Sequence, residues 1–167
     1  EESNYICRDC AKNKNKKEAE KLFDFAYSEL QKNLILHPLD IRINVQLAQL
    51  AMVGAQIKQD RHFIFEGEEY LEDALKKTPE RQQIQYSLAS FKLQLNKVDE
   101  AIKLLEDSIN NDPKITEGWI RLADLYQRLN NYEALKDLIN RAKNDGVLFS
   151  PDDEQQIANF LNTGFDK

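Results

Sequence analysis

Glycine, proline and methionine are scarce in this 167-residue sequence, with five, four and one copies. So few turn-forming residues disfavour an all-β fold. There is no run of about 18 apolar residues, so we expect no membrane insertion by this chain. No basic stretch followed by an apolar one opens the sequence, so we expect no signal peptide. The chain begins at Glu1 and its only methionine is Met52, from which we expect a piece excised from a longer protein.

Basic residues are outnumbered by acidic ones, which gives a net charge of −6. Phosphate binding needs clustered lysine and arginine, so we expect no nucleic-acid partner. The one basic run, at positions 12–17, is interrupted by Asn13 and Asn15, and we interpret it as the solvated start of a helix. Apolar residues make up 41% and charged residues 31% of the chain, a balance typical of a soluble domain.

Cysteine and histidine are too few and too scattered to predict a metal centre. Cys7 and Cys10 form a single C-x2-C pair, and the only histidines are His37 and His62. A structural zinc site needs four ligands at suitable spacing, so we expect no metal and no cofactor. The two cysteines are either free thiols or one strained local disulfide. Phosphate-loop, zinc-protease and nucleophile-elbow motifs are also missing, which argues against an enzyme.

A repeat organises the sequence. Pro79 and Pro113 lie 34 residues apart, and a small residue lies 12 positions before each, at Gly67 and Ala101. Ala26 stands at the same distance before Pro38. A period of 34 residues is the length of a helix–turn–helix unit, and proline ends each unit because it lacks an N–H and clashes with the preceding turn.

The last copy of the repeat is the clearest. Trp119, Leu122, Ala123 and Tyr126 recur at the spacing of one helix face, and a second apolar stripe follows the turn at 130–131. This arrangement resembles the tetratricopeptide pattern W-x2-L-G-x2-Y. The resemblance implies an all-α fold, namely a right-handed α-solenoid of tetratricopeptide (TPR) repeats with a C-terminal capping helix.

We divide the chain into three parts. Residues 1–14 are a weakly ordered segment or a degenerate first helix, 15–147 hold about three and a half repeats, and 148–167 hold the capping helix and tail. The step from Pro38 to Pro79 is 41 residues, so seven extra residues are placed near 56–63, as a lengthened first helix plus a longer turn. The predicted helix pairs are 40–59 with 66–77, 79–95 with 98–111, and 114–129 with 132–145.

A binding surface is predicted on the first helix of each pair. In stacked helix pairs these helices line a concave face, which suits a protein partner bound as an extended peptide or a helix. The side chains of this surface should point away from the Leu/Ala stripe and should therefore not be needed for folding. Tyr86 is the predicted main anchor, because an aromatic ring with a hydroxyl gives contact area at a low entropy cost. The alternative is a solvated wall in a structural spacer without a ligand. The predicted surface consists of Arg42, Val45, Gln49, Met52, Gln83, Tyr86, Ser90, Leu93, Glu117, Ile120, Asp124 and Gln127.

Several stretches have a narrower resemblance. L-F-D-F-A at 22–26, H-P-L-D-I-R at 37–42, Y-L-E-D-A-L at 70–75, T-P-E-R-Q-Q-I at 78–84 and I-A-N-F-L at 157–161 resemble the soluble C-terminal repeat region of bacterial O-antigen ligase-like membrane proteins. The resemblance implies an interaction module tethered to a larger membrane protein. None of that family's catalytic residues is carried over, and neither the membrane side nor the oligomeric state follows from it.

Overall fold

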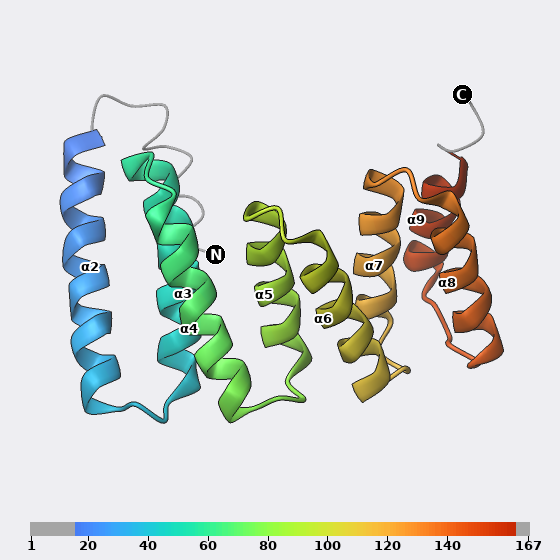
Figure 1. Cartoon of the computed structure of the whole chain (residues 1–167), viewed down its shortest axis with the longest axis horizontal. Coiled ribbons are helices and arrows are strands. Elements are labelled where there is room, and N and C mark those ends of the chain that lie inside the picture. The colour runs from blue at the N-terminus through green and yellow to red at the C-terminus, as the bar shows by residue number, and fades with distance from the viewer. Residues whose placement is uncertain (1–15, 163–167) are drawn as a thin grey trace. The chain divides into compact units, whose positions relative to one another are not determined.

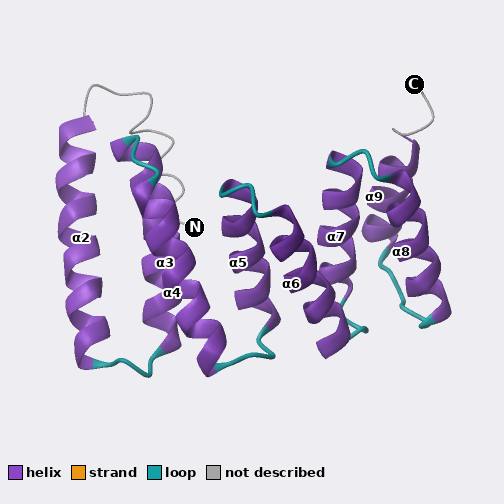
Figure 2. Cartoon of the chain, viewed as in Figure 1, coloured by secondary structure: helices purple, strands orange, loops and turns teal. Residues whose placement is uncertain are grey.

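The computed structural model describes residues 16–162, which form helices joined by short loops, with no strand among them (Figures 1 and 2). This arrangement confirms the predicted all-α fold. The chain divides into two compact units, Glu1–Pro79 and Glu80–Lys167. Unit 1 contains α2 (Lys16–Leu36), α3 (Ile41–Lys58) and α4 (His62–Lys77). Unit 2 contains α5 (Gln82–Gln94), α6 (Val98–Asn111), α7 (Thr116–Arg128), α8 (Tyr132–Asn144) and α9 (Pro151–Asn162).

A proline stands in each link between helix pairs. Pro38, Pro79 and Pro113 are each the second residue of a four-residue link. The residue before proline is forced out of the helical region, and Asp112 accordingly has an extended backbone with φ −152° and ψ 96°. Each link therefore shifts the start of the next helix to a later residue. As a result α5 begins at Gln82 and α7 at Thr116, a few residues later than predicted.

The turns inside the helix pairs all have the same length. Three residues separate α3 from α4, α5 from α6 and α7 from α8, and each turn holds one left-handed residue, namely Gln59, Asn96 or Asn130. The predicted longer turn near 56–63 is therefore wrong. The predicted lengthening of the first helix is found, because α3 is five residues longer than α5; the other two extra residues lie in α4, which is two residues longer than α6. Helical residues satisfy their own backbone hydrogen bonds, which a longer turn would not do.

An aromatic cluster holds unit 1 together. The ring of Phe23 on α2 stacks on Tyr27 at a centroid distance of 5.2 Å and meets the edge of Phe63 on α4 at 5.1 Å. The Tyr27 hydroxyl donates a hydrogen bond to Glu66 over 2.7 Å. Phe23 also lies directly against Gly54 on α3, where a side chain would leave no room for the ring. The three helices of unit 1 thus share one apolar centre.

The core of unit 2 is built around Trp119 on α7, which is fully buried. Its indole N–H donates to the carbonyl of Pro113 over 2.9 Å, so the ring is fixed to the link before its own helix. Leu122 and Leu105 are buried in the same cluster, as the repeat register requires. The predicted core role of Trp119 is confirmed.

The last helix, α9, packs on α7 and α8. It begins with a reciprocal cap, in which the Asp153 N–H donates to the Ser150 hydroxyl and the Ser150 N–H donates to the Asp153 carboxylate, each over 3.2 Å. Ile157 and Phe160 are its buried apolar residues. These contacts cover part of the apolar surface that α7 and α8 would otherwise expose.

Candidate partner-binding surface

The twelve residues predicted to bind a partner fall into two groups. Four of them, from Arg42 to Met52, lie on α3 in unit 1, and the other eight lie on α5 and α7 in unit 2. Each group is described within its own unit. In unit 2, α5 and α7 contact each other, so that their predicted residues belong to neighbouring helices.

Arg42 in unit 1 already has a carboxylate partner. Its Nε donates to Oδ1 of Asp40 over 2.9 Å and its second terminal nitrogen donates to Oδ2 over 2.7 Å. The hydrogen bonds from Arg42 hold the pKa of Asp40 at about 2. The Arg42 side chain is highly exposed, but the edge that would grip a partner's carboxylate is occupied.

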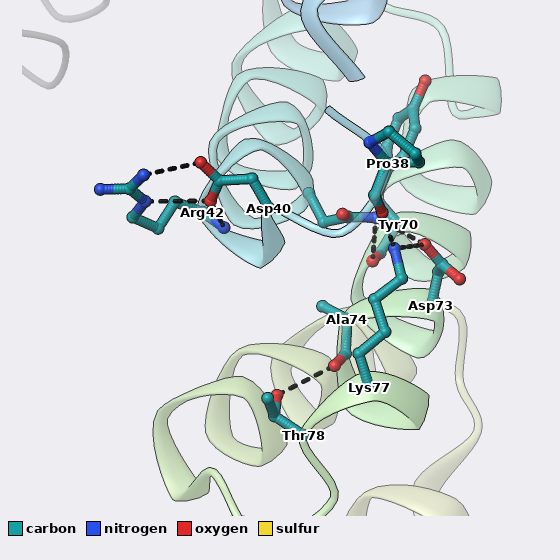
Figure 3. A network of polar contacts seen from close by, with 9 residues as sticks. Pro38, Asp40, Arg42, Tyr70, Asp73, Ala74, Lys77 and Thr78 are labelled. Atoms are coloured by element: carbon teal, nitrogen blue, oxygen red, sulfur yellow. Dashed lines mark hydrogen bonds and ion pairs between the residues drawn. The ribbon is translucent and has the colours of Figure 1, made fainter. Parts of the chain in front are cut away.

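A polar network fixes the base of α3 to α4 (Figure 3). The Lys77 ammonium donates to the carbonyl of Pro38 over 2.5 Å and to Asp73 over 2.6 Å. The buried amide of Asn44 donates to the same Asp73 carboxylate over 3.0 Å and to the carbonyl of Tyr70 over 3.2 Å. These hydrogen bonds, with that from Lys77 first, lower the pKa of Asp73. The network is structural, since each of these groups serves the attachment of α3 and its preceding turn to α4.

The other predicted residues of α3 are only partly available. Gln49 is exposed, whereas Val45 and Met52 are half-buried. On α3, therefore, Gln49 is the exposed predicted residue other than Arg42.

Tyr86 on α5 does not have the predicted exposed position. Only 6% of the residue is exposed, and it belongs to the core cluster of unit 2 together with Ile120, which is 8% exposed. Burial raises the pKa of Tyr86, and the guanidinium of Arg121 lies over its ring at 5.1 Å. The prediction that the surface residues point away from the apolar stripe is therefore wrong for Tyr86 and Ile120. It assumed a single buried stripe, but α5 packs against both α6 and α7 and buries a wider arc.

Polar residues of α5 and α7 remain at the surface of unit 2. On α5, Gln83 and Ser90 are exposed and Leu93 is half-buried; on α7, Glu117 is exposed and Asp124 and Gln127 are half-buried. These are the predicted residues in unit 2 that a partner can still reach.

Two arginines that were not predicted complete a charged row on α7. Arg121 pairs with Glu117 over 2.6 Å and Arg128 pairs with Asp124 over 3.6 Å, both four residues apart. The sequence signal was present in this spacing, since an acid and a base four residues apart lie on one helix face. Stacking of Arg121 on Tyr86 brings this charged row next to the apolar core.

The surface formed by α5 and α7 offers hydrogen-bonding side chains, and its charges alternate in sign along α7. Among residues 16–162, no group of three or more histidine, cysteine or acidic side chains is arranged to hold a metal ion. None of the helices in that range has the length and apolar character needed to span a bilayer. Cys7 and Cys10 lie outside the described residues.

Comparisons with known proteins identify the repeat. Residues 66–116 match the family model described as tetratricopeptide repeat. Among curated proteins, none matches the sequence. A crystal structure of MamA protein matches with a TM-score of 0.57 and 18% identity, over 84% of this chain and 72% of that chain. A second crystal structure of MamA matches with a TM-score of 0.56 and 16% identity, over 91% and 92% of the two chains. At these identities the likeness concerns the fold. Residues 66–116 therefore carry a tetratricopeptide repeat, and the chain has an all-α fold like that of the two MamA structures.

Proposed function

We propose that the face formed by α5 and α7 binds a peptide or a helix of a protein partner, and that this is a non-catalytic role. The observation that carries the proposal is the row of accessible polar side chains on two first helices that contact each other. Repeat proteins use surfaces of this kind for extended ligands. Gln83 and Ser90 can hydrogen-bond to a peptide backbone, and the half-buried Leu93 offers a small apolar contact.

The charges on α7 define the chemistry of the partner. Glu117 with Arg121 and Asp124 with Arg128 alternate in sign along the helix. A peptide of mixed charge can exchange its own groups with these exposed pairs, whereas a strongly acidic or basic peptide would meet like charges. Exposed ion pairs contribute little individually. We therefore expect binding of moderate affinity that weakens as salt concentration rises.

A display library of short random peptides, selected on the wild-type chain, tests the proposal. Selected peptides should bind a double variant, Ser90→Arg with Asp124→Arg, at least about tenfold more weakly, because the bulk and charge of that face change. The matched control is Lys103→Glu with Asp107→Arg on the exposed side of α6. It should leave binding unchanged, and both variants should retain the wild-type urea midpoint.

Equal binding to the wild type and the α5–α7 double variant would contradict the proposal. If only the α6 variant lost binding, the partner-binding surface would lie on the second helices of the pairs and not on α5 and α7. Failure to enrich any peptide on the wild-type chain would favour the alternative, a structural spacer that has no ligand.

The relation to bacterial O-antigen ligase-like proteins remains a hypothesis that rests on the sequence stretches alone. It predicts that the full-length reading frame encodes a series of apolar helices upstream of Glu1, which would tether this domain to a membrane. Sequencing the complete gene is the test, and a frame without such helices would exclude this origin.

A further inference from the structure

Helix α2 carries a second apolar face that none of the described helices covers. Phe23 and Tyr27 point into the core of unit 1, but other large apolar side chains of α2 and of the turn after it are exposed. The exposed fractions are 59% for Leu22, 68% for Phe25, 79% for Ile35, 70% for Leu36 and 83% for Leu39. In a stacked helix array this face would be covered by a neighbour.

The spacing of this face is that of a coiled-coil seam. Leu22, Phe25, Glu29, Lys32 and Leu36 follow one another along α2 in alternating steps of three and four residues, so that two charged residues lie between the apolar ones. Apolar residues at such steps form a narrow stripe along one side of a helix, the stripe that a partner helix covers. From residue 22 to residue 36 the stripe is about 21 Å long.

The stripe is symmetric about its own centre. In an antiparallel pair of identical helices related by a two-fold axis, residues whose numbers add to a constant lie opposite each other. With the axis between residues 30 and 31, Phe25 faces Leu36 of the second copy, and Leu22 lies level with that copy's turn after α2, which holds Leu39. In the same register Glu29 faces Lys32, and by symmetry Lys32 faces Glu29.

Charge selects this register. Within one chain Glu29 and Lys32 already form an ion pair of 2.6 Å, and both side chains remain substantially exposed. They are therefore available to a second pair across the axis. Moving the axis to residue 29 would instead place two Glu29 carboxylates opposite each other, and like charges in such a position are repulsive.

We propose that this face of α2 is a self-association surface that pairs two copies of the chain in antiparallel orientation. Large apolar side chains of this kind bury about 60–120 Å² each, so the five of them per copy, scaled by their exposed fractions, give about 400–900 Å² in the pair. Stable complexes bury about 1,200–2,000 Å². The dimer is therefore weak and concentration-dependent.

Two single charge variants provide the test. Glu29→Lys places two lysines opposite each other twice per dimer, and Lys32→Glu does the same with two glutamates. In sedimentation equilibrium at submillimolar concentration, the wild type should dimerise and each variant should be weakened at least about tenfold. An equimolar mixture of the two variants should form a heterodimer, because both lysines of the Glu29→Lys chain then face both glutamates of the Lys32→Glu chain.

The mixture separates the proposal from a purely local role of the Glu29–Lys32 pair, since mixing cannot restore an ion pair within one chain. Phe25→Glu should abolish the dimer, while the matched control Leu148→Glu, at a 90% exposed residue of unit 2, should not. A wild type that remains monomeric at submillimolar concentration would overturn the proposal. So would single variants that dimerise normally, or a mixture that stays monomeric. A dimer that appears only after removal of residues 1–15 would show that this segment, and not a second copy, occupies the face.

Discussion

Replacing Gly54 by alanine should destabilise unit 1, although alanine is the better helix former. A Cβ added at Gly54 would lie 2.3 Å from Cζ and 2.6 Å from Cε2 of Phe23. Carbon atoms pack at about 3.5–4.0 Å, so the ring would have to move by more than 1 Å, on the order of 1.4 Å. Its neighbours Tyr27 and Phe63, with ring centroids at 5.2 and 5.1 Å, stand in the way.

Two opposing effects set the size of the change. Alanine is favoured over glycine in a helix interior by about 1 kcal/mol. Overpacking a well-filled core costs about 1–3 kcal/mol, and occasionally more. Two ring atoms of Phe23 would lie less than 3 Å from the added Cβ, and the neighbouring rings limit its movement. We therefore take the upper end of that range. The expected net loss in the free energy of unfolding is on the order of 2 kcal/mol.

A double-mutant cycle isolates the cause. Phe23→Leu removes the ring atoms that would clash, at its own cost to stability. In that background Gly54→Ala should become neutral or stabilising, by up to about 1 kcal/mol, because only the helix preference remains. The double variant should therefore be more stable than the sum of the two single changes predicts, by about 2–3 kcal/mol.

The assay is urea unfolding followed by far-UV circular dichroism. Fluorescence of Trp119, the only tryptophan, reports unit 2 in the same samples. If Gly54→Ala raised the unfolding midpoint in the wild-type background, the inferred contact between Gly54 and Phe23 would be wrong. Equal effects of Gly54→Ala with and without Phe23→Leu would refute the explanation even if the single variant were destabilised.

Three further predictions concern individual residues. Tyr86→Ala should cost about 3–5 kcal/mol because it empties a core position, whereas Tyr86→Phe, which keeps the ring in place, should cost much less. Urea unfolding of both variants checks this, and a near-neutral Tyr86→Ala would mean that the ring is not part of the core. The carboxylate of Asp40 caps α3, and its pKa is lowered to about 2. Its stabilising effect should therefore be complete above about pH 4 and should disappear as the pH falls through about 2. The difference in urea midpoint between the wild type and Asp40→Ala should shrink over that interval, and a constant difference would contradict the assignment. Cys7 and Cys10 should hold no stoichiometric zinc, so elemental analysis that finds one zinc per chain, lost on Cys→Ser substitution, would prove this wrong.

Within residues 16–162, the helical character and the repeat could be predicted from the sequence because the relevant signals are local. Proline at 38, 79 and 113 fixes the links through its own backbone restrictions, whatever the rest of the chain does. The spacing of Trp119, Leu122 and Tyr126 marks one side of a helix by geometry alone. The span predicted for α6, 98–111, agrees with the structure at both ends.

Side-chain accessibility was less predictable, because it depends on how many neighbours a helix has. Gln85 and Lys92 occupy positions where aromatic residues are usual in the repeat, yet both are buried, and Lys92 pairs with Glu100 over 2.7 Å. Long polar side chains can be buried once their polar ends find partners. No hydropathy pattern along α5 would indicate that, since the partners come from other helices.

The sequence by itself therefore determined the repeat, the helix boundaries to within a few residues, and the core role of the Trp119 stripe. Only the tertiary structure decided that the rest of the seven extra residues lengthen α4 and not the turn, that Tyr86 belongs to the core, and that Gly54 makes room for Phe23. The physical reason is the range of the interactions. Backbone restrictions and helical periodicity act within a few residues, whereas burial and close packing are set by contacts between helices that are distant along the chain.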